Sequence, residues 1–130
     1  MRLSEYRSLR REIESLKERR VRIMADLTRV TQKISGMPRG SGSGDDKLLK
    51  GMARLDDIDR QLGETVDRYI DTCSEILADI DGLEDSTARE VLRLRYVDGL
   101  SWGRIARTTH YSKSRLYQIH SQALRELRDQ

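Results

Sequence analysis

Two stretches of the chain repeat apolar residues with alternating spacings of three and four, and this constrains the fold more than any other feature. Such a period of about 3.5 residues is typical of helices that pack along a coiled-coil seam. The first set is Tyr6, Leu9, Ile13, Leu16, Arg20, Ile23, Leu27, Val30 and Ile34, and the second is Leu48, Met52, Leu55, Asp59, Leu62, Val66, Tyr69, Cys73, Ile76, Ile80 and Leu83. We therefore expect two long helices, each with one charged residue in its seam.

The segment between these stretches, residues 35–46, contains Pro38 and several glycines, which disfavour a continuous helix. We expect a flexible linker here that lets the second helix return antiparallel to the first. Residues 1–36 carry a net charge of +5 and residues 48–85 a net charge of −7, so the two helices attract each other.

This charge pattern favours a hairpin within one chain, although pairing of the two helices across subunits stays open. In the hairpin, Arg20 and Asp59 should form a buried ion pair that fixes the register. Residues 1–84 would form this helical hairpin domain. Because a two-helix hairpin buries little surface, we also expect a homo-oligomer, with a dimer favoured.

The last third of the chain, residues 85–130, predicts three shorter helices over 87–97, 101–108 and 112–128. Thr87 and Glu90 have the spacing of a capping box. Ser101 and Ser112 are placed to cap the second and third of these helices. Between them, His110 occupies a turn position where histidine tolerates a left-handed conformation better than most residues.

The third of these helices has an apolar back and a polar front with almost no acidic side chain. The front, together with two arginines of the preceding helix, supplies the candidate DNA-binding residues Arg104, Arg107, Lys113, Ser114, Arg115, Tyr117, Gln118 and Gln122. Cationic and amide side chains on one face of a helix suit the major groove of double-stranded DNA. The sequence thus predicts an all-α protein: a long antiparallel, coiled-coil-like hairpin followed by a three-helix helix-turn-helix module.

Residues 86–129 resemble region 4 of bacterial σ70-type sigma factors, the part that recognises the −35 promoter element. The matching residues are Trp102, Ile105, Ala106, Ser112, Lys113, Arg115, Leu116, Gln118, Ile119, Ala123, Leu124, Leu127 and Arg128. The resemblance implies base contacts from Lys113, Ser114 and Gln118. The family has glutamate where this chain has Ser114 and arginine where it has Tyr117, so a different target sequence is expected.

The layout of the whole chain resembles small phage-encoded transcriptional regulators, the RinA- and ArpU-like late-gene activators. That resemblance implies control of phage or prophage late genes and adds RNA polymerase to the expected partners. The alternative is a small terminase-like subunit for DNA packaging, which also combines a helix-turn-helix with helical oligomerisation elements. Terminase subunits usually place the DNA-binding module first, so the order of elements here favours the regulator.

No catalytic constellation is apparent, and we expect no enzyme activity, cofactor, metal site or small-molecule substrate. His110 and His120 have no cysteine or carboxylate partner at a metal-ligand spacing. One cysteine excludes an internal disulfide framework. The sequence has no signal peptide and no apolar run long enough to cross a bilayer, so we expect a cytoplasmic protein of a bacterial cell that does not bind membranes.

Overall fold

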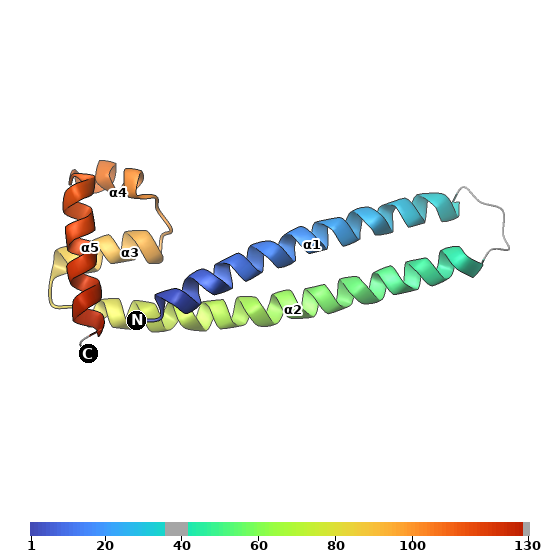
Figure 1. The fold of residues 1–130 in the computed structure, drawn as a ribbon, viewed down its shortest axis with the longest axis horizontal. Coiled ribbons are helices and arrows are strands. Elements are labelled where there is room, and N and C mark those ends of the chain that lie inside the picture. The colour runs from blue at the N-terminus through green and yellow to red at the C-terminus, as the bar shows by residue number, and fades with distance from the viewer. Residues whose placement is uncertain (36–41, 129–130) are drawn as a thin grey trace. The chain divides into compact units, whose positions relative to one another are not determined.

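The computed structural model describes residues 1–35 and 42–128, and all secondary structure within these ranges is helical. Two long helices precede three short ones (Figure 1). The helices are α1 (Leu3–Ser35), α2 (Gly42–Asp81), α3 (Ser86–Tyr96), α4 (Trp102–Thr109) and α5 (Lys113–Arg128). The expected all-α architecture, with a long helical hairpin before a helix-turn-helix module, is confirmed.

The chain divides into two compact units. One comprises residues 7–69 and contains most of α1 and α2; the other comprises residues 1–6 and 70–130. The second unit therefore combines the first residues of α1, the end of α2 and all three short helices. The sequence placed a domain boundary at residues 84 and 85, and a functional division at that point stays a prediction.

In the first unit, α1 and α2 lie side by side and run in opposite directions within one chain (Figure 1). Two ion pairs join the helices in this antiparallel order, Arg20 with Asp59 and Glu12 with Arg68. On α1 the buried and half-buried positions coincide with the expected seam. In this unit they are Leu9, Ile13, Leu16, Arg20, Ile23, Leu27 and Val30.

On α2, two residues of the expected seam, Met52 and Asp59, are exposed, and that part of the prediction is wrong by one residue. Leu48, Leu55, Leu62 and Tyr69 lie in the seam as expected. Gly51 and Ile58 take the places of Met52 and Asp59, and Thr65 is buried beside the half-buried Val66. Burying Ile58 avoids the desolvation cost that a buried Asp59 would carry. The hydroxyl of Thr65 is satisfied by donating to the carbonyl of Gln61 at 2.8 Å.

The predicted pair of Arg20 and Asp59 is confirmed, with Arg20 Nε donating to Asp59 Oδ1 at 2.6 Å. The expectation that it is buried is wrong, because the two side chains are 42% and 44% exposed. The shift of the α2 seam explains this: Ile58 fills the interface and Asp59 lies beside it. A solvent-exposed pair of this kind contributes about 0–1 kcal/mol to stability.

The linker expected over residues 35–46 is shorter than predicted. Ser35 is the last residue of α1, and α2 already begins at Gly42, so residues 42–46 are helical; residues 36–41 lie outside the described ranges. Asp45 lies in the first turn of α2, where a carboxylate interacts favourably with the helix dipole. Asp46 pairs with Lys50 at 3.2 Å, one turn further on. These interactions offset the low helix propensity of the glycines.

Two glycines inside α2 differ in what surrounds them. A Cβ built on Gly63 meets no atom within 4 Å, whereas a Cβ on Gly51 would lie 2.5 Å from Leu27 Cδ2. We expect Gly63→Ala to raise the free energy of unfolding by about 0.5–1 kcal/mol, because alanine loses less backbone entropy in a helix. Urea denaturation followed by circular dichroism measures this change.

The matched variant Gly51→Ala makes the same change where the Leu27 side chain of α1 lies directly against the backbone of α2. It should show no gain in stability, because the new methyl group forces Leu27 out of its place in the seam. Equal stabilisation by both variants would contradict the close contact between Gly51 and Leu27.

Candidate nucleic-acid interface

Helix α4 is capped at both ends by its own chain. Ser101 Oγ accepts a hydrogen bond from the backbone N–H of Arg104 at 3.2 Å, as expected of an N-cap residue. At the other end, His110 has φ 64° and ψ 16°, and its N–H bonds to the carbonyl of Ala106 at 2.9 Å. The left-handed conformation predicted for His110 is confirmed, and it ends α4 sharply.

The turn continues directly into α5. Tyr111 N–H donates to Thr109 Oγ1 at 3.4 Å, and Ser112 Oγ accepts from the backbone N–H of Arg115 at 3.1 Å. Ser112 therefore caps α5, which starts at Lys113. Side-chain and backbone hydrogen bonds thus fix the angle between α4 and α5, the two helices of the helix-turn-helix.

The N-cap of α3 lies two residues before the expected one, Thr87. It is Asp85, whose side chain accepts from the N–H of Thr87 at 3.0 Å. The cap predicted from Thr87 and Glu90 is therefore wrong. The reason is local: the carboxylate of Asp85 accepts from a free N–H group of the first turn and adds a favourable negative charge at the helix start.

The three short helices pack on one another around a common apolar core. Val91 and Leu92 of α3, Ile105 of α4 and Leu116 of α5 have no exposed surface. Ile119, Ala123 and Leu127 continue the buried stripe of α5. The back of α5 is therefore held against α3 and α4, and its opposite face is left to solvent.

Trp102 organises an aromatic cluster beside this core. Its ring meets the rings of Tyr117 and His120 edge to face, with centroids 5.4 Å and 5.1 Å away. The guanidinium of Arg95 lies over Trp102 at 4.9 Å from the centroid, and Tyr96 Oη shares a hydrogen bond of 2.6 Å with His120 Nε2. The sequence did not reveal that Trp102 contacts the half-exposed Tyr117.

Every residue predicted to contact DNA is exposed. Arg104 and Arg107 extend from α4, and Lys113, Ser114, Arg115, Tyr117, Gln118 and Gln122 extend from α5. A shallow hollow along α5 is lined by Ser114, Arg115, Tyr117, Gln118, Ser121, Gln122 and Arg125. The structure therefore adds Arg125 to this surface. Arg125 follows Ser121 by four residues and Gln118 by seven, and residues at these spacings share one face of a helix. The sequence therefore contained a signal that could have identified it.

The basic residues of the module divide into two groups. Those of α3 interact with their own chain: Arg93 pairs with Asp81, and Arg89 donates to the carbonyls of Leu83 and Glu84. By contrast, Arg104, Arg107, Lys113 and Arg115 form no side-chain ion pair within the described part of the chain. The charges on α4 and α5 are thus available to an external anion, and the residues lining the α5 hollow include no carboxylate.

This geometry defines a helix-turn-helix, a class of module that binds DNA through its second helix. A model for the family described as sigma-70, region 4, matches residues 85–129, the same part of the chain. The C-terminal third is therefore a sigma-70 region 4-like helix-turn-helix with a DNA-binding regulatory role. Comparisons with curated proteins and with solved structures found no match.

None of the helices in residues 1–35 and 42–128 is long and apolar enough to span a membrane. Within the same ranges, no group of three or more His, Cys, Asp or Glu side chains is arranged to hold a metal ion.

Proposed function

We propose that the protein is a sequence-specific regulator of transcription that inserts α5 into the major groove of double-stranded DNA. The observation that supports this most directly is the exposed face of α5. It combines unpaired cations with serine and glutamine side chains, and it belongs to a module that the sigma-70 region 4 model matches. Cations can hold phosphates, and amides can read base edges.

Within this proposal the residues have different roles. Arg104, Arg107 and Arg115 surround the reading face and serve phosphate contacts. Lys113, Ser114 and Gln118 lie near the start of α5, the part of a recognition helix that contacts bases in this class. Tyr117 and Gln122 complete the surface, and the ring of Tyr117 is held by Trp102.

We further propose control of phage or prophage late genes in the bacterial cytoplasm, with RNA polymerase as a protein partner and a homo-oligomeric, preferably dimeric, state. The sequence resemblances support these finer assignments. The packaging alternative predicts a ring of many subunits, which a mass measurement of the protein in solution distinguishes from a dimer. Selection of bound duplexes from a random DNA pool tests the proposal itself, since a reading helix enriches one sequence and a purely electrostatic surface enriches none.

Affinity for DNA should fall steeply with salt. If the basic residues of α4 and α5 neutralise about four to six phosphates per module, a plot of log K against log [salt] should have a slope of roughly −4 to −5. A dimer that engages two modules should double the slope. Fluorescence anisotropy titrations at several NaCl concentrations give this value. A slope near zero would contradict binding through the phosphate backbone.

A further inference from the structure

The outer half of the hairpin, between its turn and the middle of the two helices, lacks a buried core. Beyond Leu16 in α1 and before Ile58 in α2, no residue whose side chain is described is buried, although the seam continues with Ile23, Leu27 and Leu55. Two helices alone cover only one narrow stripe of each other. Apolar residues outside that stripe therefore stay in water unless another surface covers them.

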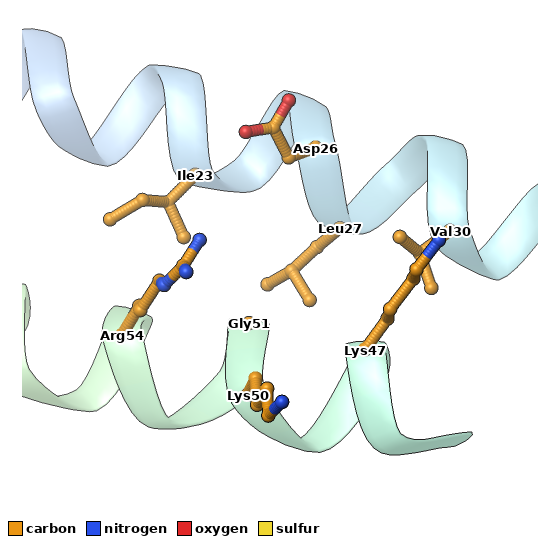
Figure 2. A pocket seen from close by; sticks show the side chains of 8 residues that line it. All are labelled: Ile23, Asp26, Leu27, Val30, Lys47, Lys50, Gly51 and Arg54. Carbon is orange, nitrogen blue, oxygen red and sulfur yellow. The ribbon is translucent and has the colours of Figure 1, made fainter. Parts of the chain in front are cut away.

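One side of this outer half carries charged side chains, and the other side carries exposed apolar side chains. On one side, residues that directly precede a seam position line a shared hollow: Asp26 of α1 and Lys47, Lys50 and Arg54 of α2 (Figure 2). In an antiparallel pair, residues that directly precede a seam position on either helix lie on the same side of the pair. These charged side chains therefore surround a hollow whose base is apolar. Ile23, Leu27 and Val30 belong to that base.

Residues that directly follow a seam position project from the opposite side, because consecutive residues of an α-helix are about 100° apart. Four of them are apolar: Val21 and Met24 on α1, and Leu49 and Met52 on α2. Their exposed fractions are 69%, 40%, 66% and 51%. We name these four residues the tip patch. All four belong to the same compact unit, residues 7–69.

We propose that the tip patch is the interface at which two copies of this chain associate into an antiparallel four-helix bundle. When both hairpins point the same way, the tip patches of two copies can meet along the outer half of the hairpin. A two-fold axis parallel to the helices then places α1 of one copy against α2 of the other. Each pair of neighbouring helices is antiparallel, as in four-helix bundles with short connections.

Charge supports a second copy as the occupant. Residues 1–36, which contain α1, have a net charge of +5, and residues 48–85, which contain most of α2, have a net charge of −7. In this bundle each basic helix borders two acidic helices, and the two copies of α1 occupy opposite corners. Asp56, Asp67 and Asp71 of α2 also form no ion pair within the described residues, so acidic charge remains for the helix of a partner.

Sedimentation equilibrium of the full chain tests the proposal. The wild-type protein should sediment with twice the chain mass of 15.1 kDa. The double variant Leu49→Gln/Met52→Gln should sediment as a monomer, because it replaces apolar contacts of the patch by amides that lose water on association. The matched control Lys47→Gln/Lys50→Gln places two glutamines on the opposite side of the same turns, and it should remain a dimer.

Helical content by circular dichroism shows whether each variant is folded. If Leu49→Gln/Met52→Gln loses its helices, Val21→Gln/Met24→Gln tests the same patch from the other helix. A wild-type protein that is monomeric at tens of micromolar overturns the proposal. So does a folded tip-patch variant that stays dimeric, since the interface then lies elsewhere.

Discussion

Replacing Leu116 by alanine should lower the free energy of unfolding by about 2–5 kcal/mol. Leu116 lies in the first turns of α5 and has no exposed surface, so the substitution leaves a cavity where α5 packs on α3 and α4. The loss is large because a three-helix module of this size has few buried side chains to redistribute. Thermal and urea denaturation followed by circular dichroism measure it.

The exposed neighbour Ser114 provides the control for this prediction. Ser114→Ala changes the opposite face of the same helix and should alter stability by no more than about 0.5 kcal/mol. If Leu116→Ala were equally mild, the contact of α5 with the core would be much looser than its burial indicates.

Replacing Gln118 by alanine should weaken binding to the selected DNA site by roughly 5- to 150-fold, corresponding to about 1–3 kcal/mol, and leave binding to random DNA almost unchanged. Gln118 is exposed on α5 one turn beyond Ser114, and its amide can make two hydrogen bonds to an adenine. Competition titrations with specific and random duplexes separate the two affinities.

Two further substitutions test whether residues at the start of α5 contact bases or phosphates. Lys113→Ala should weaken both affinities if the lysine holds a phosphate, and only the specific one if it reads a base. Ser114→Glu restores the acidic residue of sigma region 4 and should shift the selected sequence toward cytosine. Equal losses on specific and random DNA for Gln118→Ala would contradict the assignment of α5 as the reading helix.

The local features of the DNA-binding module could be predicted because short-range chemistry determines them. Ser101, His110 and Ser112 act on backbone groups within a few residues of themselves. The apolar stripe of α5 likewise follows from helical periodicity alone. The cap at Asp85 was misassigned because several residues near the start of α3 can serve as caps, and the sequence does not rank them.

Long-range packing limited the rest of the prediction. The spacing of α2 allows two seams, one with Met52 and Asp59 and another with Gly51 and Ile58, and only the contact with α1 decides between them. The aromatic contacts of Trp102 join residues from different helices, so no local pattern reveals them. Arg125 was missed because only the packing of α5 on α3 and α4 shows that this residue lies on the exposed face of α5.

The edge-to-face contact of Tyr6 with Tyr96, at a centroid distance of 5.8 Å, determines where the chain can be cut. Tyr6 lies in the first turns of α1, yet it covers part of α3. The buried Ile80 of α2 and Leu83, two residues after the end of α2, belong to the same compact unit. A fragment that starts at residue 85 would keep the contact of Tyr96 with His120 but lose its contact with Tyr6. The compact unit that contains the helix-turn-helix is thus formed by residues 1–6 together with residues 70–130. A transfer of the module to another protein needs both of these segments.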